Sequence, residues 1–231
     1  MAPLKMLSVY ILNYVSILTT MLDFLDQCII GFDKTLRTVL PAWPSTSEIE
    51  NPSLKHADIA LTRIDSRQSQ SMMRVNLAGE VAAQGLYRGQ MMFAKNPQLK
   101  AQLEQAALEE FNHYVWCLER LKELNADPSL FNPIWYFGAL SIGLFAALMS
   151  DDISLGFIIA TEEQVSQHLA SHLLHLPLND LKSRAIVETM YEDELKHAEN
   201  AENSGGTRLP LMAQNLMHWS AQVMIRVSRL I

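Results

Sequence analysis

The sequence has few of the residues on which several large classes of protein depend. Only two of its 231 residues are cysteines, Cys28 and Cys117, which are too few for a disulfide framework, so a reducing, cytoplasmic compartment is expected. Nine glycines and nine prolines favour long helices over a turn-rich β fold. The net charge is -7 and no basic stripe is present, which argues against nucleic acid as a partner. A glycine-rich nucleotide fingerprint following a strand is also lacking.

Apolar residues, which make up 49% of the chain, recur with helical periodicity. The pattern predicts four long helices, at about 71–94, 98–125, 152–175 and 179–203. Asn96-Pro97 and Pro177 separate the members of each pair, so each pair is expected to form an antiparallel hairpin. An apolar crossover helix at about 134–149 joins the hairpins, and an amphipathic helix at about 209–230 follows them. The predicted fold is therefore all-α, a four-helix bundle with two additional helices.

The chain is expected to divide into three parts. Residues 1–21 form an apolar N-terminal extension of unknown role, either an anchor or translated upstream sequence. Residues 22–70 comprise an amphipathic segment at 22–40 and a polar linker at 45–70. Residues 71–231 form the bundle.

One pattern of acidic residues and histidines occurs twice. Glu80 is followed thirty residues later by Glu110-Phe-Asn-His113, and Glu162 is followed thirty-two residues later by Glu194-Leu-Lys-His197. Residues three apart lie on one face of a helix, so each Glu-x-x-His pair directs a carboxylate and an imidazole to one point. Four carboxylates and two imidazoles are the ligand set of ferritin-like di-iron proteins. The repeat predicts a two-metal site at Glu80, Glu110, His113, Glu162, Glu194 and His197.

The positions of these residues on their helices support this interpretation. All six continue apolar stripes, whereas Glu163 lies on the more polar side of its helix. Four carboxylates in a core cost several kcal/mol each unless they are paired or bound to cations. The competing interpretation is that these are surface Glu-His pairs on amphipathic helices. His168 and His172, one turn apart, form either a polar patch near the site or ordinary helix-face histidines.

The crossover is apolar enough to raise the question of a membrane. If it crossed the bilayer once, Glu162 would lie on the opposite side from Glu80 and Glu110, and one site could not include all three. An interfacial or re-entrant helix is therefore favoured over a transmembrane one, with an ordinary buried helix as the alternative. Its residues Ile142, Leu144, Phe145 and Leu148 are expected at the membrane surface or along a channel for an apolar substrate.

From about Phe32 to the C-terminus the chain resembles the demethoxyubiquinone hydroxylases of ubiquinone biosynthesis. One departure is Leu77-Ala78, where the family usually has His-Thr. The matching stretches are Arg74-Val-Asn-Leu-Ala-Gly-Glu80 with Ala83-Gln84, Glu110-Phe-Asn-His113, Asn132-Pro-Ile-Trp-Tyr136, Ser150-Asp-Asp-Ile-Ser-Leu-Gly-Phe157, Ala160-Thr-Glu-Glu-Gln-Val165, Lys182-Ser-Arg-Ala-Ile186 and Asp193-Glu-Leu-Lys-His197.

The resemblance implies a membrane-associated monooxygenase that holds two iron ions and hydroxylates a polyprenyl quinol or quinone ring with O2, at the cytoplasmic face of the membrane. Glu80 and Glu162 would each serve one metal, and Glu110 and Glu194 would bridge. Asp193 is a candidate partner for a ligand histidine. A soluble di-iron oxidase, iron-oxidising or peroxide-scavenging, and a metal-free interaction bundle are the alternatives. The electron donor, tail length and oligomeric state stay open, as do contacts with other ubiquinone-biosynthesis proteins.

Overall fold

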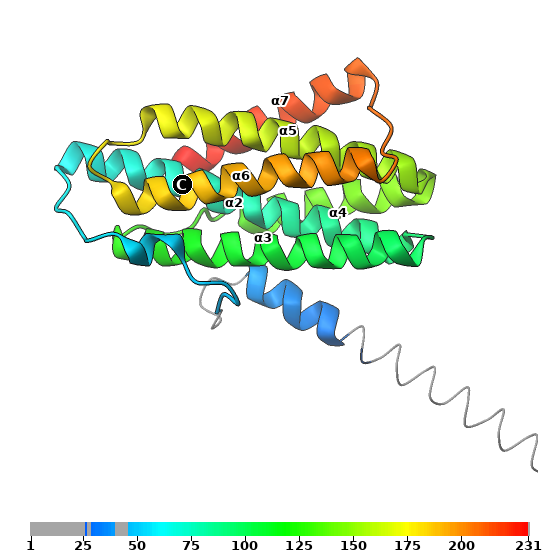
Figure 1. Cartoon of the computed structure of the whole chain (residues 1–231), viewed down its shortest axis with the longest axis horizontal. Coiled ribbons are helices and arrows are strands. Elements are labelled where there is room, and N and C mark those ends of the chain that lie inside the picture. Colours follow the sequence, from blue (N-terminus) through cyan, green and yellow to red (C-terminus); the bar gives the residue numbers. More distant parts are fainter. Residues whose placement is uncertain (1–25, 27–28, 40–45, 231) are drawn as a thin grey trace, which may run out of the picture. The chain divides into compact units, whose positions relative to one another are not determined.

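The structure, a computed structural model, describes residues 26, 29–39 and 46–230 (Figure 1). The chain divides into two compact units, Met1–Trp43 and Pro44–Ile231. In the first unit, residues 29–39 are helical, within the amphipathic segment predicted at 22–40. The predicted apolar extension at residues 1–21 lies outside the described residues.

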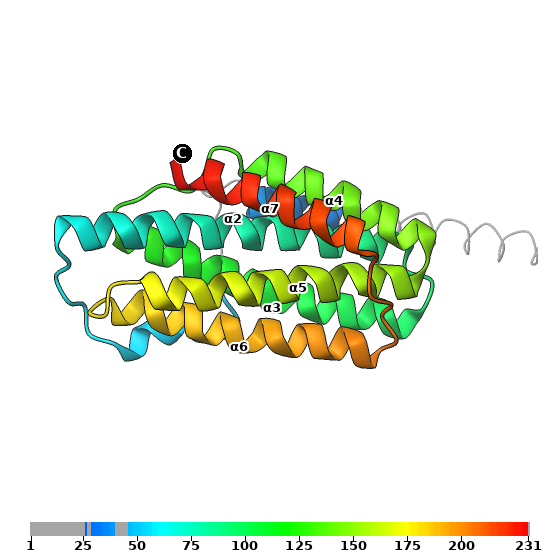
Figure 2. The ribbon, with the colours of Figure 1, turned by 90° about the horizontal axis from the view of Figure 1, so that it is seen from above.

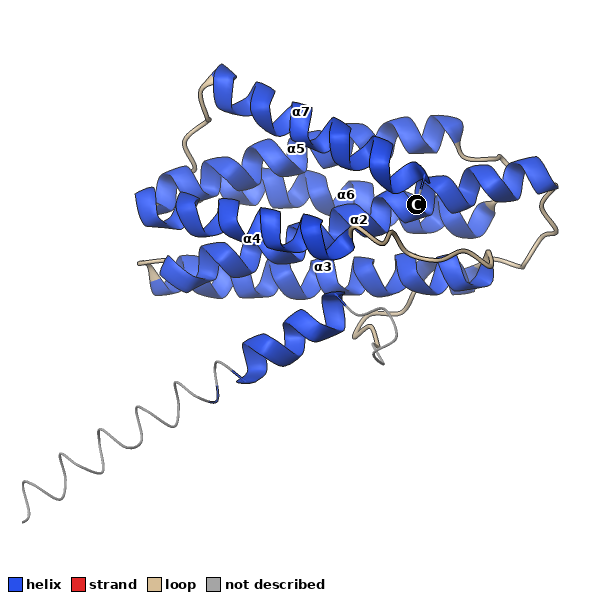
Figure 3. Cartoon of the chain, turned by 180° about the vertical axis from the view of Figure 1, so that it is seen from behind, coloured by secondary structure: helices blue, strands red, loops and turns tan. Residues whose placement is uncertain are grey.

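The second unit is a helical bundle, and its described residues contain no strand (Figure 3). The helices α2, α3, α5 and α6 run side by side and form the four-helix core (Figures 1 and 2). The crossover α4 packs mainly along α2, and α7 also packs on α2. The predicted all-α, ferritin-like fold is confirmed. The helices span Arg63–Phe93 (α2), Pro97–Glu123 (α3), Asn132–Met149 (α4), Asp151–His175 (α5), Leu181–Asn203 (α6) and Leu211–Leu230 (α7), and Pro52–Lys55 forms the short 3-10 helix η1.

Local capping signals fix most of these boundaries. Asn96 caps α3 through its side chain with Pro97 at the first position, and Ser150 caps α5 ahead of two aspartates. Asp180 Oδ1 accepts a hydrogen bond from the Ser183 amide at 3.0 Å at the start of α6. Gly205 follows α6 with a φ of 93°, a left-handed conformation that glycine adopts without strain. Apart from the start of α2, the helix ends therefore agree with the predicted ones to within a few residues.

Helix α2 begins eight residues before the predicted start at 71, so the last part of the predicted 45–70 linker is helical. Thr62 caps this end, and its hydroxyl accepts a hydrogen bond from the Asp65 amide at 3.1 Å. The polar first turns have no apolar stripe that periodicity can detect. They are held instead by side chains that reach other helices: Gln68 donates to the carbonyl of His175 and Gln70 donates to that of Leu124.

Glycines bring α2 and α4 together backbone to backbone. A Cβ atom built at Gly85 or Gly89 would overlap backbone atoms of α4, and one at Gly143 would overlap backbone atoms of α2. Close packing of this kind fixes α4 along one side of the bundle. The opposite side of α4 is exposed and apolar, with Phe137 and Phe145 at 52% and 67% exposure. The crossover is therefore not an ordinary buried helix.

Candidate metal centre

The six predicted ligands come together in the core of the bundle, although they lie up to 117 positions apart in the sequence. α2 and α5 each contribute one glutamate, and α3 and α6 each contribute a Glu-x-x-His pair, whose three-residue spacing places both side chains on the inner face. All six side chains are buried, with at most 7% of any residue exposed. They are Glu80, Glu110, His113, Glu162, Glu194 and His197.

Their ligand atoms form two overlapping groups. Glu80 and His113 belong to one group and Glu162 and His197 to the other, while Glu110 and Glu194 belong to both. Within each group the four ligand atoms lie within 4.8 Å of one another. This arrangement could hold two neighbouring metal ions with two carboxylates shared between them, the arrangement of carboxylate-bridged di-iron proteins.

The polar atoms at the centre fit a pair of cations. Neither oxygen of Glu110 has a hydrogen-bond partner among the described residues, and the same is true of Nδ1 of His113 and of His197. His197 Nδ1 lies 2.9 Å from a Glu110 oxygen, and His113 Nδ1 lies 3.4 Å from the other. Buried, unpaired nitrogen and oxygen lone pairs directed at one point are costly unless a metal or protons neutralise them.

The pKa values of the buried glutamates indicate which of them are protonated when no metal is bound. Burial raises the pKa of Glu80 and of Glu162 well above the usual range, and neighbouring carboxylates raise both further. Burial acts in the same direction on Glu110, but the adjacent imidazoles of His113 and His197 outweigh it and hold its pKa low. The metal-free centre therefore retains protons, which metal ions would displace on binding.

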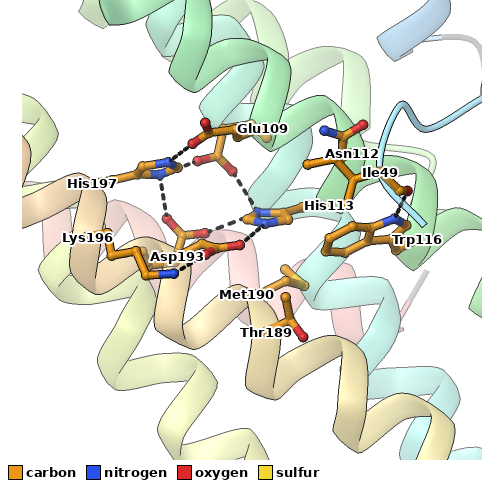
Figure 4. Close-up of polar contacts among 12 residues, drawn as sticks. Ile49, Glu109, Asn112, His113, Trp116, Thr189, Met190, Asp193, Lys196 and His197 are labelled. Atoms are coloured by element: carbon orange, nitrogen blue, oxygen red, sulfur yellow. Dashed lines mark hydrogen bonds and ion pairs between the residues drawn. The ribbon is translucent and has the colours of Figure 1, made fainter. Parts of the chain in front are cut away.

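An acidic residue precedes the ligand glutamate in both Glu-x-x-His motifs. Each of these acidic side chains contacts the histidine of the other helix (Figure 4). Glu109 of α3 accepts a hydrogen bond from His197 Nε2 at 2.7 Å, and Asp193 of α6 lies 3.3 Å from His113 Nε2. A proton on Nε2 leaves Nδ1, the atom that faces the centre, free to bind metal. The contact of Asp193 was expected from the sequence, but that of Glu109 was not.

Tyr87 is a further residue that sequence reasoning missed. Its hydroxyl donates a 2.7 Å hydrogen bond to Glu162 Oε1, inside the core. Burial and the charge of Glu162 raise the pKa of Tyr87 well above its usual value, so the phenol stays protonated and remains a donor. The signal in the sequence was its position seven residues after Glu80, two turns along the same face of α2.

A segment before η1 supports the outer side of His113. The ring of Trp116 lies 5.2 Å from the His113 ring, and its Nε1 donates to Ser47 Oγ at 3.1 Å. Asn112 Oδ1 accepts from Ser47 Oγ and from the amide of Glu48, both at 2.9 Å. Residues 46–51 of the predicted linker are therefore attached to α3.

A groove beside the centre leads to solvent. It has a volume of about 650 Å³ and lies between α3 and α6, with Tyr87, Glu109 and His197 among its lining residues.

His168 and His172 are not part of the metal-binding groups, although they follow Glu162 on α5. Glu163 pairs with Arg208 at 3.1 Å and is 40% exposed, which agrees with its predicted place on the polar side.

Comparison with known proteins identifies the family. The model of the ubiquinone biosynthesis protein COQ7 family matches residues 67–228. The chain is 47% identical over 204 residues to the 3-demethoxyubiquinol 3-hydroxylase of Francisella tularensis subsp. tularensis strain WY96-3418, covering 88% of this chain and 95% of that protein. The enzyme of the same name from subsp. novicida strain U112 is 46% identical over the same shares. The chain belongs to the ubiquinone biosynthesis protein COQ7 family.

Proposed function

We propose that this protein is a di-iron monooxygenase that hydroxylates the ring of a polyprenylated 3-demethoxyubiquinol. The observation that carries the proposal is the pair of ligand groups that share Glu110 and Glu194, in a chain 47% identical to a 3-demethoxyubiquinol 3-hydroxylase. The reaction converts a ring C–H, O2, two electrons and two protons into a ring C–OH and water. Two ferrous ions supply the electron transfer to O2 when they are bound.

The residues around the centre would hold the two metal ions and orient their ligands. Glu80 and Glu162 would each hold one metal ion, and Glu110 and Glu194, which belong to both groups, would be shared between the two ions. Tyr87 fixes the orientation of Glu162, while Glu109 and Asp193 orient the two imidazoles. Burial of the whole set keeps bulk water away from the ligand atoms.

The exposed apolar residues of α4 and α7 support attachment to a membrane. Phe145 of α4 and Leu216 and Trp219 of α7 are each 65–67% exposed, and both helices lie on the α2 side of the bundle (Figure 2). The segment Asn132–Met149 is long and apolar enough to cross a bilayer. However, the helices on either side of it, α3 and α5, supply ligands to one centre, which favours a helix lying in the interface. We place the protein on the cytoplasmic face as a peripheral membrane protein.

The alternatives account less well for these observations. A soluble di-iron oxidase has no use for two adjoining helices with apolar exposed faces. A metal-free interaction bundle leaves four buried carboxylates without compensating charge. The electron donor stays unassigned.

The activity is tested with purified protein reconstituted with iron. We expect about two iron ions per chain and O2-dependent conversion of a short-tail demethoxyubiquinol to its hydroxylated product. A strain that lacks the protein is expected to accumulate the demethoxy intermediate. Full hydroxylation by metal-free protein would contradict the proposal.

Membrane attachment is tested separately by co-sedimentation with phospholipid vesicles. Phe145→Asp and Leu216→Asp each remove an apolar contact worth about 1.5–3 kcal/mol and introduce a charge, so we expect a loss of at least tenfold in vesicle binding. Leu174→Asp is the matched control, because Leu174 is 84% exposed on α5. Equal binding by all three variants would exclude α4 and α7 as the membrane surface.

A further inference from the structure

Outside the metal centre, α2 and α5 carry several buried polar atoms that have no hydrogen-bond partner among the described residues. His172 is 1% exposed, and neither of its ring nitrogens has a hydrogen-bond partner among the described residues. Nε2 of His168, one turn earlier, is also buried and without a partner there. These two histidines were noted in the sequence, and the metal centre does not use them.

The stretch of α2 at the same level along the bundle has buried polar atoms of the same kind. Ser69 is fully buried and Asn76 is 3% exposed, and Oγ of Ser69 and Oδ1 of Asn76 lack partners within the described part of the chain. Two hydrogen bonds between α2 and α5 bound this interval, one from Gln68 to the carbonyl of His175 and one from Tyr87 to Glu162. The two helices run antiparallel, so the four residues lie between the same two hydrogen bonds along the length of the pair.

The two imidazoles are uncharged. Burial lowers the pKa of His168 to about 4 and that of His172 to about 2, and the charge of Arg229 lowers both further. Their ring centroids are 4.0 Å apart. A neutral imidazole has one N–H donor and one acceptor nitrogen, so the pair offers hydrogen bonds of both kinds.

The residues around the two histidines limit which kind of ligand can form hydrogen bonds with their ring nitrogens. Two histidines one turn apart are a spacing that binds transition metals, but Arg229 of α7 opposes a cation here. Ser228, next to Arg229, is buried and accepts a hydrogen bond from Trp135 Nε1 at 3.2 Å, which ties α7 to α4 at this level. These surroundings favour an uncharged ligand that carries both hydroxyl and ether or carbonyl oxygens.

The interval lies close enough to the metal centre for one bound ring to reach both the histidines and the metal positions. His168 is six residues after Glu162, a rise of about 9 Å along α5. That distance is comparable with the width of a substituted benzene ring plus one hydrogen bond. The same interval is next to α7, one of the two helices whose exposed apolar residues form the membrane surface in the proposed function.

We propose that Ser69, Asn76, His168 and His172 form a binding site for the oxygen substituents of the quinol ring. The site rests on the proposed function and makes it more specific: it distinguishes oxygenated rings from other apolar ring compounds. A hydroxyl group of the quinol donates to an imidazole nitrogen, and an imidazole N–H donates to a methoxy or hydroxyl oxygen. The alternative occupant is water, and the experiment separates the two.

The test compares His172→Leu with His175→Leu, the same change one turn further along α5 at an exposed position. The iron-loaded protein is titrated without O2 with a short-tail methoxy-methyl hydroquinone and with an alkylbenzene that has the same tail and no ring oxygens. We expect His172→Leu to weaken binding of the hydroquinone about tenfold and to leave the alkylbenzene within about twofold. His172→Gln, which keeps a donor and an acceptor, is expected to restore part of the loss.

Iron content and thermal unfolding complete the test. Removal of an unpartnered buried group is not expected to lower the unfolding temperature or the iron content of the unliganded protein. Unchanged hydroquinone binding in His172→Leu would overturn the proposal in favour of water, and equal losses for both ligands would overturn it in favour of simple packing. If His172→Leu does not fold, His168→Gln and His172→Gln decide by the same comparison. A wild-type protein that binds the hydroquinone but never hydroxylates it would refute the proposed function and leave this site standing.

Discussion

The crossed pairs Glu109–His197 and Asp193–His113 allow a quantitative test of how the outer carboxylates support the metal centre. In Glu109→Gln the hydrogen bond from His197 Nε2, 2.7 Å in length, loses its charged acceptor. Partners of this kind contribute about 10–100-fold to metal affinity, which corresponds to about 1.4–2.7 kcal/mol. We therefore expect iron to bind about 10–100-fold more weakly in Glu109→Gln.

Asp193→Asn is expected to have a smaller effect. Its contact with His113 is longer, at 3.3 Å, and its other oxygen is paired with Lys196 at 2.8 Å. The His113 hydrogen bond lowers the pKa of Asp193 to about 2, so this carboxylate is ionised over the whole range of a practical assay. The order of iron affinity should accordingly be wild type, then Asp193→Asn, then Glu109→Gln.

The assay is retention of iron against a graded series of chelator concentrations. Glu104→Gln is the matched control, because Glu104 is an exposed glutamate on the same helix and is not a partner of either ligand histidine in the described structure. If Glu109→Gln retains iron as well as Glu104→Gln does, the outer carboxylates do not support the metal, and the reasoning from the 2.7 Å contact is refuted.

Three further predictions concern other parts of the bundle. Glu110→Ala, which removes a carboxylate common to both ligand groups, should lose most of the iron, whereas Glu80→Ala should keep about one ion per chain; equal iron contents would contradict the shared arrangement. Gly89→Ala should destabilise the fold by at least 1–3 kcal/mol, roughly the cost of overpacking, because a Cβ there overlaps the α4 backbone. Gly138→Ala has open space and should stabilise by about 0.5–1 kcal/mol, so a reversed order in chemical denaturation would refute this packing. The depressed pKa of His172, about 2 against 6.5 when unfolded, means that the unfolded chain alone takes up this proton as the pH falls from 6.5. Wild-type stability should therefore decrease with acidification, and His172→Leu should reduce that slope by up to about 1.4 kcal/mol per pH unit, as followed by denaturation at pH 4.5–7.

The sequence alone was sufficient for the features that depend on local spacing. A three-residue interval places Glu110 and His113 on one face of any α-helix, and the capping residues Asn96 and Ser150 mark helix starts whatever the surroundings. For this reason the helices, their order and the six candidate ligands were all predictable. That these six residues bind iron stays a prediction.

Only the tertiary structure decided which residues support the centre from outside their own helix. The hydrogen bonds of Glu109 and Tyr87 join residues 88 and 75 positions apart, and local periodicity contains no information about such pairs. Close packing of α4 through Gly85 and Gly89 and the buried, unpartnered ring of His172 are equally non-local. Local geometry fixes where a side chain points on its own helix, whereas its partner is fixed by how the helices pack, because contacts between helices form only when the core is assembled.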